Sequence, residues 1–317
     1  MLYPISEPIP DSVKDRFGYI DDRGNVVVPP VYSGCSHFFE GKAAVIDENE
    51  KTGFIDAKGR LAIPHRFEGL GRFHSGVCFT CCGYINHFGE WLIPPAFLAA
   101  SAFSEGLATA STDAENFGFI DFTGRFVLPP HFRPCKPFHE GLAAVCIDER
   151  WGFINRAGEL EIPTVFEGPP PKHFRDGIAG VRIDGRWGFI DRSGSFVIKP
   201  EHEDVKPFSE GRACVRRNGK WGMMDPDGHL VLECQFEELE GLDAGMAPAK
   251  IDGKAGFISP TGKWLIESRF DRCLNFFRDL AVVKHGKTYS YIRRDGQIVW
   301  TSQPGAQLRY PPHPFFV

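Results

Sequence analysis

The sequence predicts an all-β protein made of about nine tandem units of about 34 residues, each a three-stranded antiparallel meander. The units are expected to stack into an open, twisted β-repeat array. Three observations support this fold class. A glycine recurs at spacings of 30 to 36 residues, a second glycine follows it each time by six residues, and Gly, Pro and Phe are abundant at 35, 25 and 29 residues. Many short strands joined by many turns have such a composition.

The recurring glycines define the units. The anchor series, found in phrases such as Trp-Gly-Phe-Ile-Asp, is Gly18, Gly53, Gly83, Gly118, Gly152, Gly188, Gly222 and Gly256, with Ser290 in the ninth place. The second series is Gly24, Gly59, Gly89, Gly124, Gly158, Gly194, Gly228, Gly262 and Gly296. A third series, before the next anchor, is Gly41, Gly76, Gly106, Gly141, Gly177, Gly211 and Gly245.

Each unit divides into three expected strands and a loop. The residues after the third glycine place Ala and Val two positions apart on one face of a strand, as Ala143 and Val145 do. The anchor phrase forms the second strand, and an Asp or Asn then begins a turn that ends at the second glycine. The side chain accepts backbone N–H groups, and glycine supplies the positive φ that re-entry into a strand needs. The last strand, as in residues 125–130, stops at prolines because proline cannot donate to a ladder.

The three central units resemble the WG-repeat family, also called WG-containing or KWG repeats. The matching segments run from Glu140 to Pro163, from Asp176 to Pro200 and from Glu210 to Cys234, and the resemblance covers about residues 17–300. The full signature is present at Trp151, Trp187 and Trp221, whereas the other units hold Phe17, Thr52, Cys82, Phe117, Ala255 and Tyr289. The resemblance implies a bacterial-type β-repeat array without an assigned activity, and it brings no catalytic residues.

The chain is expected to have three parts. Residues 1–16 form an N-terminal lead-in or cap, residues 17–300 the repeat array, and residues 301–317 a tail rich in proline and aromatic residues. The tail is expected to be a strap over the apolar edge of the last unit, with a flexible docking peptide as the alternative. A closed β-propeller-like ring is the alternative to the open array. Propellers usually have 4–8 blades of four strands, whereas these units show three strong strands and number nine.

Composition limits the function classes. The 36 Lys and Arg residues against 41 Asp and Glu give a net charge of −5, which does not favour a nucleic-acid or anionic-membrane partner. The first residues show no secretory signal, and no stretch approaches the roughly 18 apolar residues of a membrane span. A cytoplasmic protein is therefore expected. Its nine cysteines are then most simply free thiols.

The densest set of potential metal ligands lies in the third unit. It comprises His74, Cys78, Cys81, Cys82 and His87, with a Cys-x-x-Cys spacing that is found in zinc sites. Cys78, however, occupies a position that holds alanine in other units, which predicts a small core residue. Cys78 and Cys81 would also point to opposite faces of an extended strand. We therefore expect no metal site and no cofactor.

Other candidate sites are explained by the repeat. Cys35, Cys135 and Cys273 lie three residues before the loop Phe, where other units hold apolar residues, so they are expected to be core thiols. The Asp-Pro-Asp-Gly-His stretch at 225–229 has the start of a calcium loop but lacks the later Glu, and it coincides with the turn of the other units. Motifs of serine hydrolases, zinc peptidases, phosphate-binding loops and dinucleotide-binding folds are missing, so no catalytic residue is assigned.

Seven basic residues cluster in the two best-formed units. They could form a stripe for phosphate or an acidic protein, but interleaved acids such as Asp184, Asp191 and Glu210 favour an ordinary solvated face. The basic residues are Arg182, Arg186, Arg192, Arg212, Arg216, Arg217 and Lys220.

These observations favour a non-catalytic scaffold that presents one long surface to a protein partner. The alternative is a ligand-binding module for a saccharide or cell-envelope polymer, with exposed aromatic residues as stacking platforms. Its sequence motive is Trp91, Trp264 and Trp300, which lie outside the shared Trp position, and burial of all three would remove that motive. A metal-dependent or other enzyme is the third hypothesis. The ligand-binding residues stay unknown at this stage.

Overall fold

The computed structural model describes residues 1–9, 15–69, 71–80 and 83–306. These residues form β-strands, turns and loops without any helix, in nine small antiparallel sheets that follow one another along the chain. The chain divides into two compact units: unit 1 is Met1–Pro130, Gly286–Ile292 and Ile298–Val317, and unit 2 is His131–His285 and Arg293–Gln297. The all-β repeat prediction is confirmed. Among the described residues there is no helix long and apolar enough to span a membrane.

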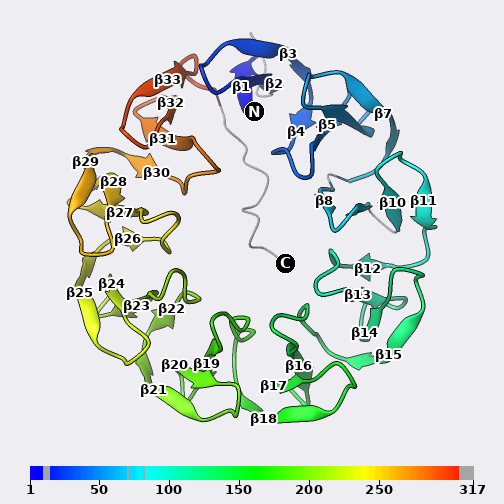
Figure 1. The fold of residues 1–317 in the computed structure, drawn as a ribbon, viewed down its shortest axis with the longest axis vertical. Coiled ribbons are helices and arrows are strands. Elements are labelled where there is room, and N and C mark those ends of the chain that lie inside the picture. Colours follow the sequence, from blue (N-terminus) through cyan, green and yellow to red (C-terminus); the bar gives the residue numbers. More distant parts are fainter. Residues whose placement is uncertain (10–14, 70, 81–82, 307–317) are drawn as a thin grey trace. The chain divides into compact units, whose positions relative to one another are not determined.

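Four sheets come first in the chain (Figure 1). Their strands are β1 (Tyr3–Pro8), β2 (Asp15–Ile20) and β3 (Val26–Tyr32); β4 (Gly34–Cys35), β5 (Lys42–Ile46), β6 (Thr52–Asp56) and β7 (Leu61–Phe67); β8 (Phe73–His74), β9 (Val77–Phe79), β10 (Tyr84–Asn86) and β11 (Trp91–Ile93); and β12 (Ala99–Ala100), β13 (Ala108–Ser111), β14 (Phe117–Ile120) and β15 (Phe126–Phe132).

Five further sheets follow. Their strands are β16 (Ala143–Ile147), β17 (Arg150–Ile154) and β18 (Leu160–Phe166); β19 (Ile178–Ile183), β20 (Arg186–Asp191) and β21 (Phe196–His202); β22 (Asp204–Val205), β23 (Ala213–Arg217), β24 (Lys220–Met224) and β25 (Leu230–Phe236); β26 (Glu238–Leu239), β27 (Ala247–Ile251), β28 (Lys254–Ile258) and β29 (Trp264–Phe270); and β30 (Arg272–Cys273), β31 (Ala281–His285), β32 (Thr288–Ile292) and β33 (Ile298–Thr301).

Six sheets have four strands, one more than predicted. The extra strand is a two-residue segment of the loop, such as β22, that pairs with the first long strand of its sheet. In the sheet of β16–β18 the same contact is a single bridge between Cys135 and Val145. A pairing of two residues leaves little trace in an apolar pattern, so the sequence indicates only the three strong strands of each repeat.

The anchor glycine lies where the last strand arches over the second strand. In the sheet of β16–β18, Trp151 pairs with Phe166 and Phe153 with Ile162, so the last strand has extra residues between the two pairs. A Cβ on Gly152 would lie 2.6 Å from the carbonyl oxygen of Ile162. Glycine is therefore needed here because the backbone of a neighbouring strand occupies the space of a side chain.

The second glycines close the turn as the sequence predicted. All nine have a positive φ, between 79° and 89°. In the sheet of β19–β21, the Asp191 carboxylate accepts the N–H groups of Ser193 (2.8 Å) and Ser195 (3.1 Å) ahead of the last strand. The turn assignment is confirmed, and the recurring Asp residues are occupied by backbone N–H groups.

The core lies between successive sheets. Each cluster of buried apolar residues joins the second and last strands of one sheet to the loop and first strands of the next. Phe153 of β17, for example, packs edge-on against Phe174 of the following loop with ring centres 5.0 Å apart. Phe189 and Phe208 repeat this contact at 5.0 Å in the next pair of sheets. The apolar residue before each third glycine therefore fixes one repeat to its predecessor.

In unit 1 the last sheet makes this contact with the first sheet. Tyr291 of β32 donates a hydrogen bond from its hydroxyl group to the carbonyl oxygen of Pro4 (2.6 Å), and its ring lies 5.7 Å from that of Tyr3. β1 lies beside β32 and β33 in Figure 1. A Cβ on Gly24 would lie 2.0 Å from the carbonyl oxygen of Val299, where other second glycines approach the last strand of the preceding sheet. The last repeat is therefore in contact with the first repeat through residues of unit 1. The predicted open array is wrong because its two ends would not touch.

The predicted terminal segments are only partly described. Tyr3–Pro8 is the first strand of the first sheet and pairs with β2, and residues 10–14 lie outside the described part. Ser302 N donates to the carbonyl oxygen of Tyr289 (2.8 Å) and Ala306 is buried, so residues 302–306 follow the last sheet. The rest of the expected strap, residues 307–317, lies outside the described residues.

Candidate binding surface

The potential metal ligands of the third repeat, for which no metal site is expected, differ in their surroundings. Cys78 is fully buried, and burial raises the pKa of its thiol to about 12. His74 is exposed, whereas His87 stacks on Phe73 at 4.4 Å and lies 3.2 Å from the Glu40 carboxylate. Cys81 and Cys82 lie outside the described residues. Of the described members of this set, Cys78 is a core residue, His87 contacts Phe73 and Glu40, and His74 is exposed to solvent.

Three cysteines occupy the core positions that the repeat predicted. Cys35, Cys135 and Cys273 are buried, and burial raises the pKa of each thiol to about 12. A thiol with such a pKa is protonated at neutral pH and is a poor nucleophile and metal ligand. These residues are confirmed as packing residues.

The 225–229 turn brings three potential metal ligands together. Ligand atoms of Asp225, Asp227 and His229 lie within 4.8 Å of one another, a grouping that no other three described His, Cys, Asp or Glu residues make. The Asp225 carboxylate, however, accepts the N–H groups of Asp227 (3.1 Å) and His229 (2.9 Å), as Asp191 does in its own turn. The three residues therefore lie together because the Asp225 side chain closes this turn at the surface.

The basic residues between Arg182 and Lys220 do not form an acid-free stripe. Arg217 pairs with Glu201 at 2.7 Å and Arg216 approaches Glu203 at 4.0 Å, both in the same hairpin region. Arg192 instead donates to the carbonyl oxygen of Glu140. Two of these arginines thus have glutamate partners and the third has a backbone partner. Such an arrangement is typical of an ordinary solvated face with interleaved acids.

The signature tryptophan lies against a lysine of the preceding loop. The Lys172 ammonium nitrogen is 4.7 Å from the ring centre of Trp187, and that of Lys206 is 5.0 Å from Trp221. A cation over an indole face gains roughly 0.5–2 kcal/mol. Lysine stands five residues before the third glycine in each of the three Trp units, including Lys136, and in none of the others. The joint occurrence of this lysine and the signature tryptophan is visible in the sequence, and our sequence analysis missed it.

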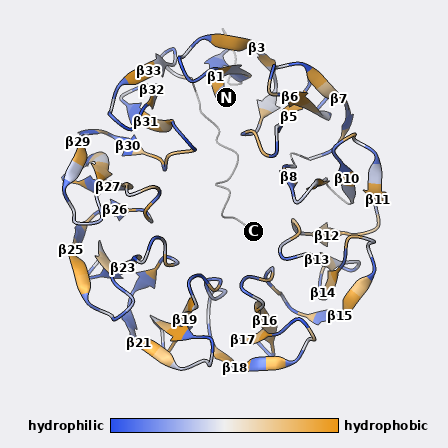
Figure 2. Ribbon diagram, in the orientation of Figure 1, coloured by the Kyte–Doolittle hydropathy of each residue, from blue (hydrophilic) through white to orange (hydrophobic). Residues whose placement is uncertain are grey.

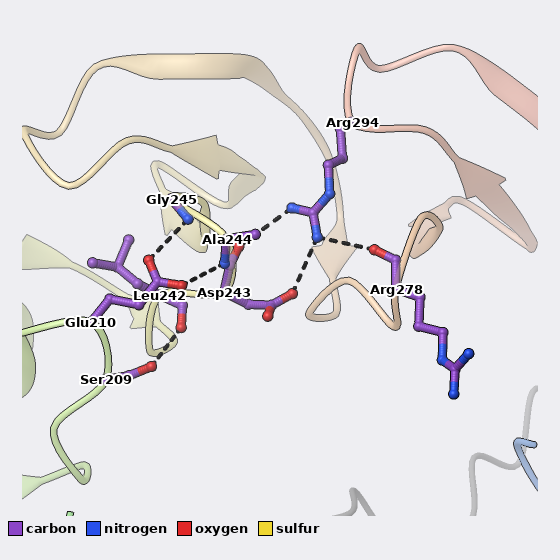
Figure 3. Close-up of polar contacts among 8 residues, drawn as sticks. All are labelled: Ser209, Glu210, Leu242, Asp243, Ala244, Gly245, Arg278 and Arg294. Atoms are coloured by element: carbon purple, nitrogen blue, oxygen red, sulfur yellow. Dashed lines mark hydrogen bonds and ion pairs between the residues drawn. The ribbon is translucent and has the colours of Figure 1, made fainter. Parts of the chain in front are cut away.

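Glutamates connect the turns of successive loops. We define the loop turn as the two-residue turn that ends at, or aligns with, the third glycine. The Glu210 carboxylate accepts the N–H groups of Ala244 (2.6 Å) and Gly245 (2.9 Å) in the next loop turn (Figure 3). Glu140 likewise accepts the N–H group of Gly177 at 3.0 Å. Glu140 and Glu210 are therefore hydrogen-bond acceptors between successive repeats.

At one junction where the glutamate is missing, an arginine connects the two loops instead. Ala244 stands in the glutamate position, and the next loop turn has Asp279 in place of glycine. Arg294 donates to the Asp243 carboxylate (3.4 Å) and to the carbonyl oxygen of Arg278 (3.0 Å), so it connects the two loops (Figure 3). At these junctions the polar residues of the loop turns therefore connect one repeat to the next.

Eight of the nine last strands carry exposed large apolar side chains, and β25 carries none. Figure 2 shows hydrophobic residues along β3, β7 and β15, and Val27, Leu92, Val127, Val197 and Leu265 are exposed at equivalent positions. Each last strand lies at the edge of its sheet, and a run of apolar residues on such edges is a common feature of interaction surfaces. Prolines and the arch over the anchor glycine interrupt these edges, which limits pairing with another strand.

The last strands of the two units differ in charge. In unit 1 no acidic residue lies in the last strands, which are β3, β7, β11, β33 and the portion of β15 that belongs to this unit. In unit 2, each last strand contains one glutamate: Glu161, Glu201, Glu233 and Glu267. The last strands of unit 1 therefore offer the less polar surface.

The largest departure from the repeat lies around β11. Phe88 is 80% exposed and Leu98 is 68% exposed, the two highest values among the exposed large apolar residues. Phe88 stands in a turn position that holds a polar or small residue in the other eight repeats, and Leu98 in one that is polar in the other repeats with this position. Trp91 and Leu92, between them, are 43% and 44% exposed. We call Phe88, Trp91, Leu92 and Leu98 the β11 patch.

The three tryptophans outside the signature are not fully buried. Trp91 is exposed, and its ring packs edge-on against Phe67 at 5.5 Å, which holds it in place. Trp264 and Trp300 are half-buried. Burial of all three tryptophans would have removed the motive for the saccharide hypothesis, and none of the three is buried.

Comparison with known proteins agrees with the repeat assignment. The family model described as WG containing repeat matches eight times, at residues 17–51, 53–82, 83–113, 117–151, 151–187, 187–221, 221–254 and 256–289. No curated protein sequence is similar enough to match this chain.

Two solved structures share the fold at low sequence identity. The crystal structure of a eukaryotic initiation factor is 10% identical, covers 96% of each chain and gives a TM-score of 0.66. The computationally designed Ika8 protein is 13% identical, covers 83% of this chain and 93% of its own, and gives a TM-score of 0.50. At these identities the similarity concerns the fold alone.

Proposed function

The chain belongs to the WG-repeat family, and we propose that it is a non-catalytic scaffold that binds a protein partner through the last strands of its sheets. The observation that carries this proposal is the row of exposed aliphatic residues on those strands, such as Val27 and Val127. Soluble monomers rarely expose contiguous apolar surface without a binding role. Several carboxylates of the loops and turns, such as those of Asp191 and Glu210, accept backbone N–H groups, which supports a binding role over a catalytic one.

We also propose that the repeats form a closed, propeller-like arrangement. The hydrogen bond from Tyr291 to Pro4 is the equivalent of the contact from Tyr19 to Ala44, because Pro4 and Ala44 pair with corresponding residues of their sheets. Tyr3 stands at the register position of Ala43, and its ring takes the place of the loop Phe that the first sheet lacks. The last and first repeats thus use the contacts of any two neighbouring repeats.

The scaffold proposal is tested with a photoreactive amino acid at Val27, an exposed site on β3. A defined cross-linked protein, recovered repeatedly from cells that express the chain, is expected. The matched control carries the same group at Asp252, an exposed hairpin residue of unit 2. Cross-links of equal pattern from both positions, or none from Val27, Val127 and Leu265 in turn, would contradict a specific surface on the last strands.

A saccharide or cell-envelope polymer is the second candidate ligand. The exposed, fixed ring of Trp91 favours it, because a rigid aromatic face stacks on a sugar ring at small entropic cost. Titration calorimetry with soluble envelope polysaccharide fragments tests this candidate. Binding that Trp91→Ala abolishes and Trp264→Ala leaves intact supports it, whereas no heat with any fragment argues against it.

A further inference from the structure

Three polar side chains of unit 1 form a hydrogen-bonded chain between the sheet of β4–β7 and the sheet of β8–β11. The ammonium nitrogen of Lys42, in β5, lies 3.2 Å from Nδ1 of His87, in the turn after β10. Nε2 of His87 lies 3.2 Å from the Glu40 carboxylate, which also accepts the N–H group of Gly76 at 3.0 Å. These contacts join the second repeat to the third.

The two neighbours of His87 determine its charge. An ammonium group can only donate a hydrogen bond, so Nδ1 must be the nitrogen without a proton. A carboxylate can only accept one, so Nε2 carries the proton. The imidazole that satisfies both neighbours is therefore neutral. A second proton would enter at Nδ1, where it would face the Lys42 ammonium group across 3.2 Å.

The repeat does not require a histidine or a lysine at these positions. The position of His87 holds Arg192 and Arg294 in two other repeats, and each arginine donates to the loop turn of the preceding repeat. The position of Lys42 holds an apolar residue, such as Leu107, in most other repeats. Arginine stays charged at every physiological pH, whereas histidine changes its charge between about pH 5 and 8. The His87 junction can therefore change its charge, and the two arginine junctions cannot.

Glu40 keeps its charge when His87 gains a proton. Burial alone would raise the pKa of the Glu40 carboxyl, but the N–H group of Gly76 and the contact with His87 hold this pKa below its ordinary value. The protonated imidazole thus keeps its partner at Nε2, and its ring remains stacked on Phe73 at 4.4 Å. Lys42 is the member of the chain that loses its acceptor.

Lys42 has one further contact, with the ring of Phe73, 5.7 Å from its ammonium nitrogen. Repulsion between two like charges at 3.2 Å exceeds the attraction of a partly exposed cation for an aromatic ring. The other titratable side chains near His87 on these loops and turns have surroundings of their own. They are His37, which is buried; Arg72, over the Phe39 ring at 5.2 Å; His74, which is exposed; and Glu90, 2.9 Å from the Asn86 amide nitrogen.

We propose that Glu40, Lys42 and His87 form a pH-sensitive switch at this junction. At neutral pH the neutral imidazole holds the Lys42 ammonium group beside the Phe73 ring. In mildly acidic solution the protonated imidazole stays with Glu40 and releases Lys42 to solvent. The switch thereby changes the charge that this loop of unit 1 presents to solvent, and it does not depend on the protein partner proposed above.

NMR spectroscopy of the full chain with ¹³C-labelled lysine tests the switch, and the variant Lys42→Arg assigns the Lys42 signals. The ring current of Phe73 should shift the side-chain methylene signals of Lys42 at about pH 8. These signals are expected to lose this shift in a single-proton step as the pH is lowered to about 5. Lys206, which lies over the Trp221 ring at 5.0 Å and pairs with Glu240 at 2.7 Å, is the internal control and should keep its signals.

Two substitutions of His87 separate the switch from other pH effects. His87→Gln is expected to abolish the pH-dependent step of the Lys42 signals. His87→Arg, which introduces the residue of the two arginine junctions, is expected to give the released position at both pH values, and it should fold because the turn accepts arginine in other repeats. Lys42 signals that do not move in the wild type would overturn the inference, and so would a step of equal size in His87→Gln.

Discussion

In the first eight repeats the second strand carries a glycine beneath the arch of the last strand, whereas the ninth repeat carries Ser290 and pairs directly. Ser290 lies opposite Thr301, and their hydroxyl oxygens are 2.9 Å apart. In the eighth repeat a Cβ on Gly256 would lie 2.4 Å from the carbonyl oxygen of Ile266. The glycine therefore belongs to the arch, and a repeat without the arch accepts a side chain.

The ninth repeat also differs in what it packs against. Tyr19 contacts Phe38 of the next loop at 5.4 Å, but Tyr291 contacts Tyr3 of the first sheet instead. The N-terminal strand thus supplies the ring that a following loop would have supplied. The two regions show that the repeat is defined by its contacts with its neighbours, and the residues at the ends change to preserve them.

The largest effect is expected at the contact between the last and first repeats. Tyr3→Ala removes a fully buried ring and should lower the free energy of unfolding by about 4 kcal/mol, as truncation of a core aromatic residue does. Chemical denaturation of the full chain measures this loss. Tyr32→Ala, at a half-buried tyrosine of the first sheet, is the control and should cost less. Equal losses would mean that Tyr3 does not join the two repeats.

The arch is tested next, by Gly152→Ala. The new Cβ would meet the carbonyl oxygen of Ile162 at 2.6 Å, and backbone cannot move aside as a side chain can, so a loss of about 3 kcal/mol is expected. Ser290→Ala is the matched change in the ninth repeat and should cost only about 1 kcal/mol, for the hydroxyl hydrogen bond. Similar losses of unfolding free energy in the two variants would show that the arch does not require the glycine.

Much of this architecture could be predicted from local patterns. The Asp-x-x-Gly turn is a property of a few adjacent residues, so Asp191 and Gly194 indicated their turn and its positive φ without any tertiary information. The core role of Cys35 also followed, because equivalent positions in other units are apolar. Because the units repeat, equivalent positions within one chain can be compared, and this comparison shows which positions are apolar.

The contacts between distant segments could not be predicted in the same way. Tyr3 lies before the recognisable repeat, and only its register opposite Ile20 shows that it replaces a residue of the array. The β11 patch was also missed, since Phe88 looks like one more turn residue until its exposure is known. The pairing of lysine with the signature tryptophan was readable, but it needed alignment on the third glycine instead of the anchor.

A smaller effect tests whether the two junctions are equivalent. Tyr291→Phe removes the hydroxyl group that donates to Pro4, and Tyr19→Phe removes the one that donates to the carbonyl oxygen of Ser36 (2.8 Å). Each should lower the free energy of unfolding by about 1 kcal/mol, the usual net worth of a buried hydrogen bond. Denaturation of both variants under one set of conditions gives the comparison. A clear loss at Tyr19 with none at Tyr291 would indicate that the last junction is not formed like the others.

The last test concerns pH and the contact between two loops of unit 2. Burial, and then the neighbouring His139, Arg175 and Lys172, lower the pKa of His173 to about 4. Its ring lies 4.3 Å from that of His139. Between pH 4 and the ordinary pKa of about 6.5, the unfolded chain binds a proton at this residue that the folded chain does not, so stability falls as the pH falls through this range.

His173→Gln removes this proton uptake, and its unfolding free energy should therefore depend less steeply on pH between 4 and 6.5 than that of the wild type. Urea denaturation at a series of pH values measures the two slopes. If His173→Gln keeps the wild-type slope, the loop contact opens before it can exclude a proton, and the contact between the His139 and His173 rings holds the two repeats together only weakly.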